Sequence, residues 1–193
     1  KVDMTDKLLI KNAFFSFIKA FLVLVSPLIT FPYASRILLP EGIGKVNFAN
    51  SVISYFLIFS SLGIKNYASR EVAKLKENKL ELSKFVKEIL LINSISTIVV
   101  YIIMILGIKA IPQLYNERYL LLLCSLTLIF TVFSVDWLYI GLEKFRFTTI
   151  CSFFIQISCI TLMFCFVNTK NDFFLYTFFL TICPCIITGF INF

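Results

Sequence analysis

The chain contains no histidine, the side chain that enzymes use most often as a general acid or base near neutral pH. It also contains no Gly-x-x-x-x-Gly-Lys-Ser/Thr segment, so it has no loop that would cradle the phosphates of ATP. Charged residues make up 15% of the chain, against about 25% in an ordinary soluble domain. These absences argue against a soluble enzyme and against an ATP-driven machine within this sequence.

Apolar residues dominate instead: they make up 59% of the chain, which includes 23 Phe. They form six stretches, at residues 14–34, 46–64, 89–108, 119–140, 147–167 and 173–193. About 20 apolar residues in a helix cross a hydrocarbon core of about 30 Å, so each stretch is long enough to span a membrane. The sequence therefore predicts an all-α integral membrane protein with six transmembrane helices.

The cysteines give no sign of a disulfide framework or a metal site. All of them lie within predicted spans, where they act as small apolar packing residues: Cys124, Cys151, Cys159, Cys165, Cys183 and Cys185. Cys183-Pro-Cys185 resembles an intramembrane motif of heavy-metal pumps, but the Asp-Lys-Thr-Gly motif of those pumps is absent. We expect no metal and no cofactor.

Lys and Arg fall unevenly between the apolar stretches. An N-terminus in the cytoplasm would place Lys1, Lys7, Lys11, Lys65, Arg70, Lys74, Lys76, Lys79, Lys84, Lys87, Lys144 and Arg146 on the cytoplasmic side. The opposite side would hold Arg36, Lys45, Lys109, Arg118 and Lys170. Because basic residues concentrate in cytoplasmic connectors, we predict an N-in orientation. On this interpretation the net charge of +7 reflects the basic residues in the connectors, which indicate the orientation in the membrane. We therefore expect no nucleic acid as a partner.

Residues 69–88 mix much of this charge with apolar residues at helical spacing. The pattern predicts an amphipathic helical elbow on the cytoplasmic surface, lying against anionic membrane lipids.

Polar residues inside the spans recur in steps of three and four, which places them on one face of each helix. The first stripe is Asn12, Ser16, Lys19, Ser26, Thr30, Tyr33 and Arg36, and the second is Asn47, Ser51, Ser54, Ser61 and Lys65. Shorter stripes of Ser, Thr, Asn, Gln and Cys in the other spans fit helix packing. Packing does not require Lys, Arg and several Asn, so the first two stripes predict walls of a hydrated cavity.

Two charges inside the spans leave alternatives open. Lys19 is near enough to the predicted cytoplasmic surface for its ammonium to reach water, or it lines the cavity. Asp136, beside Trp137 near the end of the fourth span, is either paired with Lys144 or Arg146 or is a protonatable group in ion coupling. Pro27 and Pro32 predict a break in the first helix, and Pro184 with Gly189 predicts one in the sixth, either where a transporter bends or as a simple kink without motion.

Three segments carry a resemblance to a known family: residues 36–50 (RILLPEGIGKVNFAN), 62–74 (LGIKNYASREVAK) and 136–143 (DWLYIGLE). In these segments and their relative positions, the chain resembles bacterial polysaccharide-unit flippases, the O-antigen and capsule translocases of Wzx type. The family usually has glycine before the proline of the first segment, where this chain has Leu39.

The resemblance implies a fold similar to multidrug-and-toxin-extrusion (MATE) transporters, with two bundles of about six helices around a cationic cavity. This chain would form the first bundle, and its last span at Phe193 leads us to expect that a second bundle is missing. The implied function is flipping of undecaprenyl-pyrophosphate-linked oligosaccharides across the bacterial inner membrane by alternating access. A polysaccharide polymerase and a chain-length regulator would fit as partners.

A hydrated glycan and an anionic pyrophosphate cannot cross lipid unaided, so such a carrier needs a polar passage with cations. On this hypothesis Lys19 and Arg36 contact phosphate or sugar acid, and Asp136 is the candidate for ion coupling. The candidates for facing the glycan are Asn12, Ser16, Ser26, Thr30, Asn47, Ser51 and Ser54.

Three alternatives remain. A drug or cation antiporter of the same superfamily would favour deep acidic residues, whereas here only Asp136 lies inside a span. A membrane enzyme, such as a polymerase or acyltransferase, would be expected to show a large catalytic loop or a histidine base. A structural or assembly subunit is the third.

Overall fold

The structure is a computed structural model that describes the backbone of residues 2–191 and the side chains of residues 10–189. Every regular element in this part of the chain is helical, which confirms the all-α prediction. The elements are α1 (Val2–Ser61), α2 (Ile64–Leu75), α3 (Lys79–Ala110), α4 (Pro112–Asn116), α5 (Arg118–Phe133), α6 (Asp136–Gly141), α7 (Phe145–Phe166), α8 (Phe173–Thr177), the π-helix η1 (Phe178–Ile182) and α9 (Cys183–Ile191).

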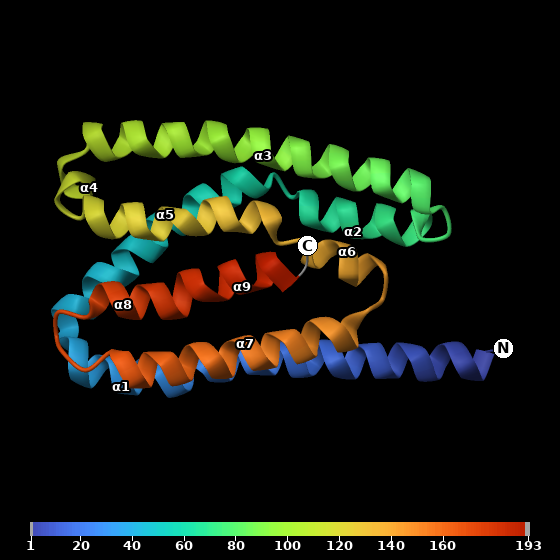
Figure 1. Ribbon diagram of the computed structural model, residues 1–193, viewed down its shortest axis with the longest axis horizontal. Helices are drawn as coiled ribbons and strands as arrows, with labels where there is room; N and C mark the ends of the chain where they lie inside the picture. The colour runs from blue at the N-terminus through green and yellow to red at the C-terminus, as the bar shows by residue number, and fades with distance from the viewer. Residues whose placement is uncertain (1, 192–193) are drawn as a thin grey trace.

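The helices run back and forth along one long axis (Figure 1). One end, which we call the N-terminal end, holds the N-terminus and the turns 76–78 and 142–144. The other, the bend end, holds the bend of α1, helix α4 and the connection 167–172. The connectors rich in Lys and Arg thus gather at the N-terminal end, as the predicted alternation of sides requires.

Helix α1 contains a sharp bend at Leu39, whose φ of 59° and ψ of 168° are not helical. Residues 2–38 form a first arm and residues 40–61 a second arm. The bend falls here because Pro40 has no N–H to continue the helical hydrogen bonds and its ring clashes with the preceding turn. The predicted break at Pro27 and Pro32 is wrong, since both residues lie inside the helical first arm.

Leu39 occupies a backbone region that is almost exclusively used by glycine and costs other residues about 1–3 kcal/mol. Its side chain is 50% exposed, so little packing would be lost on its removal. We therefore expect Leu39→Gly to stabilise the protein by about 1 kcal/mol, seen as a higher midpoint of thermal unfolding in detergent. Leu91→Gly, at an exposed position inside α3, is the control and should lower the midpoint. A lower midpoint for both variants would contradict the assigned strain.

Among the residues that the structure describes, four helical segments are long and apolar enough to cross a membrane: Ile10–Ser61, Lys79–Ala110, Arg118–Gly141 and Phe145–Phe166. Phe173–Gly189 is a shorter apolar helix. The number differs from the predicted six because the first two predicted spans are the arms of one bent helix, and the last is shorter. Residues 192 and 193 of the predicted last span lie outside the described residues. The chain is a multi-pass membrane protein.

Residues 69–88, for which the sequence predicts an amphipathic helical elbow, are divided between two helices. The chain turns at residues 76–78, and α2 and α3 are separate helices that pack against each other. Asn78 causes the division, because its side-chain oxygen accepts the N–H groups of Leu80 at 3.3 Å and Glu81 at 3.4 Å and so caps α3. Helix α2 buries Ala68 and Val72 completely.

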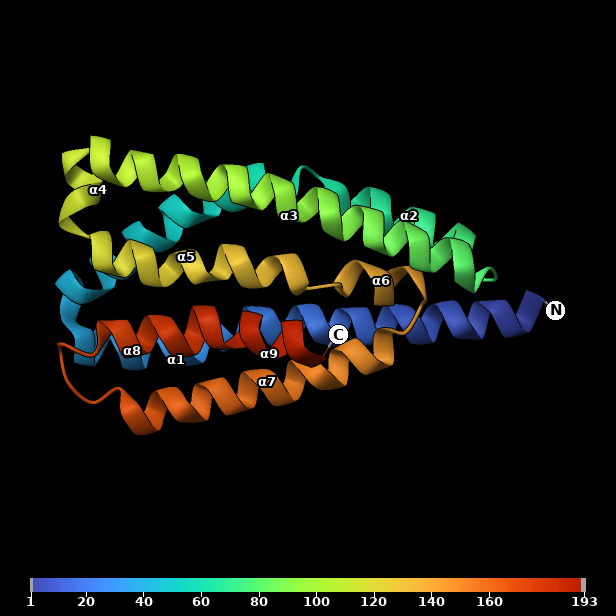
Figure 2. The same cartoon turned by 45° about the horizontal axis from the view of Figure 1, so that its top comes forward.

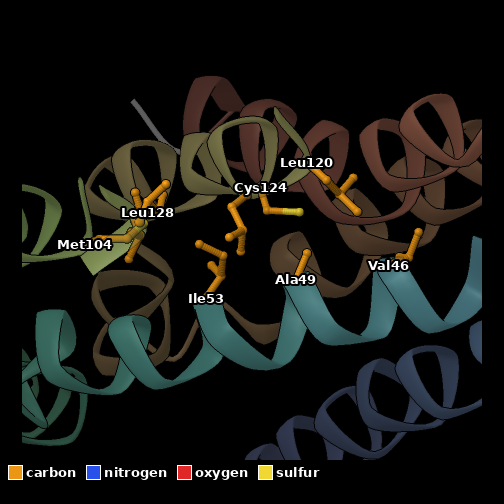
Figure 3. Packing of buried hydrophobic residues seen from close by; sticks show 9 residues of the cluster. Val46, Ala49, Ile53, Met104, Leu120, Cys124 and Leu128 are labelled. Atoms are coloured by element: carbon orange, nitrogen blue, oxygen red, sulfur yellow. The ribbon is translucent and has the colours of Figure 1, made fainter. Parts of the chain in front are cut away.

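The two arms of α1 have different neighbours. The first arm lies alongside α7, whereas the second crosses α5, as the two views agree (Figures 1 and 2). Val46, Ala49 and Ile53 of the second arm point toward Leu120, Cys124 and Leu128 of α5 (Figure 3). Since a helix turns 100° per residue, Asn47 and Ser51 must lie on the side of the second arm that faces away from α5.

Candidate functional site

Lys19 of the first arm and Asp136 of α6 form an ion pair, with the Lys Nζ 3.6 Å from the Asp Oδ2. The two side chains are 29% and 38% exposed. The sequence analysis considered Lys19 and Asp136 separately and suggested Lys144 or Arg146 as the ion-pair partner of Asp136. In the structure the partner is Lys19. The pair ties the first arm to the start of α6.

Asp136 lies at a break in the fourth predicted span. Helix α5 ends at Phe133, Ser134 has an extended backbone, and α6 begins at Asp136. A second break separates α1 from α2, where Leu62 and Gly63 have φ values of 46° and 68°. The two breaks lie at the same level along the long axis in both views (Figures 1 and 2). Helices α2 and α6 thus form a pair that continues the bundle beyond both breaks.

Gly141 makes the close approach of α2 and α6 geometrically feasible. A Cβ atom at this position would lie 2.6 Å from the Ser69 carbonyl oxygen and 2.6 Å from the Val72 Cβ. Trp137, Ala68 and Val72 complete the contact in one buried cluster. Two of the three segments that carry the family resemblance therefore meet here.

Part of the first polar stripe packs between helices. Thr30 is 3% exposed and donates a hydrogen bond to the Ser26 carbonyl oxygen at 3.0 Å. Tyr33 donates to two carbonyl oxygens at the end of α7, those of Phe164 (3.3 Å) and of Val167 (3.1 Å), the residue that follows the helix. These two residues contrast with the hydrated wall that the sequence predicts, because Thr30 is buried with its hydroxyl bonded inside its own helix and the Tyr33 hydroxyl bonds to a neighbouring helix.

The other candidates lie on partly or fully exposed surfaces. Asn12 and Ser26 are half-buried, and the exposed candidates are Ser16, Arg36, Asn47, Ser51 and Ser54. Ser16 and Lys19 border a groove of about 500 Å³ together with Leu24, Phe145 and Thr148, among others. The structure brings Lys19, Asp136 and Ser16 into one region but gathers the remaining candidates into no single pocket.

A different polar pocket escaped the sequence analysis. It has a volume of about 220 Å³ and is lined by Leu57, Ile58, Ser60, Ser61, Lys65, Asn93 and Thr131. Ser61 and Lys65 belong to the second polar stripe, but no sequence signal links them to Asn93 and Thr131, since only the packing of α1, α2, α3 and α5 brings these residues together. In the part of the chain that the structure describes, no cluster of three or more His, Cys, Asp and Glu could hold a metal ion.

A family profile described as "Polysaccharide biosynthesis protein" matches residues 9–193, which include both arms of α1, the Lys19–Asp136 pair and the Gly141 contact. The chain belongs to this family. It is also 29% identical over 147 residues to the "Putative O-antigen transporter" of Escherichia coli (strain K12). That alignment covers 76% of this chain and 35% of the relative, so the chain spans about a third of the relative's length. No solved structure matches.

Proposed function

We propose that this chain is part of a carrier that flips lipid-linked oligosaccharide repeat units across the bacterial cytoplasmic membrane, for O-antigen or capsule assembly. Its family and the name of its Escherichia coli relative support a transport role in polysaccharide biosynthesis rather than an enzymatic one. The observation that carries the proposal is the exposed polar face of the second arm of α1, where Asn47, Ser51 and Ser54 follow one another along a helix otherwise apolar enough to span a membrane. Arg36 is exposed at the end of the first arm, three residues before the bend at Leu39.

The chemistry of the cargo explains why such a face is needed. Placing a glycan hydroxyl in hydrocarbon without a partner costs about 2–7 kcal/mol, and a pyrophosphate costs far more. Asn and Ser side chains replace the water lost by the hydroxyls, and a cation replaces the water lost by the phosphates. In this proposal Arg36 and Lys19 take the anionic groups, while Asn12, Ser16, Ser26, Asn47, Ser51 and Ser54 take the glycan during transport.

We also propose how the helices are arranged in the membrane. The chain crosses the membrane six times with its N-terminus in the cytoplasm, and the exposed face of α1 looks onto a second bundle, as in MATE-like transporters. The gathering of basic connectors at the N-terminal end supports the orientation, and the greater length of the relative supports further helices. Rocking of the two bundles would expose the polar face to each side in turn, with Asp136 coupling the movement to an ion gradient.

Arg36 gives the most direct test. In the complete protein, we expect Arg36→Ala to slow the flipping of a fluorescent lipid-linked sugar in proteoliposomes by roughly tenfold or more, since a charge-assisted hydrogen bond contributes about 1.5–3 kcal/mol. Arg36→Lys should retain part of the rate. Lys109→Ala, which removes an exposed cation at the same end of the bundle, is the matched control. Unchanged flipping and unchanged surface polysaccharide for Arg36→Ala would refute the assignment, and turnover of the same lipid in an enzyme assay would favour a catalyst.

A further inference from the structure

The 220 Å³ pocket at the break between α1 and α2 collects polar groups from four helices. Ser60 and Ser61 come from the last turn of α1, Lys65 from α2, Asn93 from α3 and Thr131 from α5. The volume is below the range of about 300–1,000 Å³ that is typical of pockets for drug-sized ligands. Such a pocket has room for one small polar ligand rather than for an oligosaccharide.

The hydrogen bonds of the wall determine what the pocket offers. Ser61 donates to the Ile58 carbonyl oxygen at 3.1 Å, and Thr131 donates to the Leu128 carbonyl oxygen at 3.0 Å. Both hydroxyl hydrogens are therefore used within their own helices, and each oxygen keeps lone pairs that can accept. These two side chains present acceptors to a ligand.

Ser60 belongs to the same wall. Its hydroxyl lies 2.6 Å from that of Thr97, which donates to the Asn93 carbonyl oxygen at 2.8 Å. Ser60 is thus the donor of the pair, and the Ser96 hydroxyl donates to its carbonyl oxygen at 3.0 Å. This network joins α1 to α3 and holds the wall in place.

Lys65 and Asn93 supply the donors. The ammonium of Lys65 donates up to three hydrogen bonds, and the carboxamide of Asn93 both donates and accepts. None of the residues that line the pocket is acidic. A ligand that matches this set needs hydroxyl groups for the acceptors and an anionic group for the single cation.

We propose that this pocket binds a sugar phosphate, with Lys65 on the phosphate and Ser61, Asn93 and Thr131 on the ring hydroxyls. The proposal rests on the proposed function, because a lipid-linked repeat unit carries a sugar phosphate where the lipid joins the glycan. Lys65 follows the break by two residues and lies toward the N-terminal end, for which we propose a cytoplasmic location. The pocket is accordingly a loading site, separate from the exposed face of α1 that carries the glycan across.

Equilibrium binding to the purified complete protein in detergent tests the site without any translocation. The probes are glucose 1-phosphate, glucose, inorganic phosphate and glucuronate. We expect glucose 1-phosphate to bind more tightly than each of the other three. Glucose has no anionic group for Lys65, inorganic phosphate has no ring hydroxyls for the acceptors, and glucuronate carries a carboxylate in place of the phosphate. Lys65→Ala should weaken its binding by tenfold or more, Thr131→Val by a few-fold, and Lys65→Arg by less than Lys65→Ala.

Lys84→Ala is the matched control, since Lys84 is an exposed lysine at the N-terminal end outside the pocket. An unchanged melting temperature shows that each variant folds, which the exposed position of Lys65 favours.

The site would be refuted by equal binding to Lys65→Ala and to the unmodified protein, by an equal loss of binding in Lys84→Ala, or by the absence of any preference for the sugar phosphate. Tighter binding of glucuronate would overturn the assignment to phosphate. Failure of sugar phosphate binding leaves the flipping result for Arg36 untouched. Absence of flipping by the unmodified protein, with sugar phosphate binding intact, would contradict only the proposed carrier function.

Discussion

Gly141→Ala is expected to destabilise the protein strongly and to separate α2 from α6. The new methyl group would lie 2.6 Å from the Ser69 carbonyl oxygen and from both the Cβ and Cγ1 of Val72, distances that real Cβ atoms essentially never show. Overpacking costs about 1–3 kcal/mol, and the upper part of that range applies because one clash is with backbone that cannot rotate away. Thermal unfolding in detergent and the yield of monodisperse protein measure the effect.

Gly107→Ala is the control for this substitution. Gly107 lies inside α3, and a Cβ there would meet nothing within 4 Å. Alanine stabilises an open helix position by up to about 1 kcal/mol over glycine, so this variant should be neutral or slightly more stable. If Gly141→Ala melts at the same temperature as Gly107→Ala, the close contact between α2 and α6 is not present in the protein.

The helical nature and approximate positions of the apolar segments could be predicted from the sequence, because apolar runs of about 20 residues are a strong local signal. The bend at Leu39 also falls between the first two predicted spans, whereas the break between α5 and α6 lies inside the predicted span 119–140 and could not be predicted. Pro27 and Pro32 carry the same local signal as Pro40, yet only the third coincides with a bend. In an apolar helix the carbonyl groups that a proline frees can be satisfied in several ways, so tertiary packing decides where the chain turns.

The candidate site was predictable as a set of residue types but not as a set of contacts. Lys19 and Asp136 stand out because a charge inside a span is costly, and that cost also implies a partner. The partner itself depends on the packing of α1 against α7, which in turn contacts α6, and no spacing in the sequence encodes this packing. The pocket formed by Lys65, Asn93 and Thr131 could not be predicted for the same reason. In the sequence each residue belongs to a separate polar stripe, and only the packing of the helices brings the three together.

Removing one member of the Lys19–Asp136 pair is expected to lower both stability and transport. Lys19→Met would leave the carboxylate of Asp136 without its lysine, and Asp136→Asn would leave the ammonium without its carboxylate. Losing the ion pair costs less than the roughly 2.5–3.5 kcal/mol of an isolated charge at the centre of a span, because both side chains are partly exposed. We expect each single variant to melt at a lower temperature in detergent than the unmodified protein.

Exchanging the two residues distinguishes a structural role of Lys19 from a role in contact with the cargo. The double variant Lys19→Asp/Asp136→Lys keeps the ion pair but moves the ammonium from the first arm of α1 to the start of α6. Its melting temperature should recover most of what the single variants lose, because both charges again have a partner. Flipping should stay low if Lys19 holds a phosphate of the cargo, since the cation then projects from the wrong helix. Recovery of both flipping and stability would show that the ion pair only links α1 to α6. Arg36 would then remain as the cation that contacts the cargo.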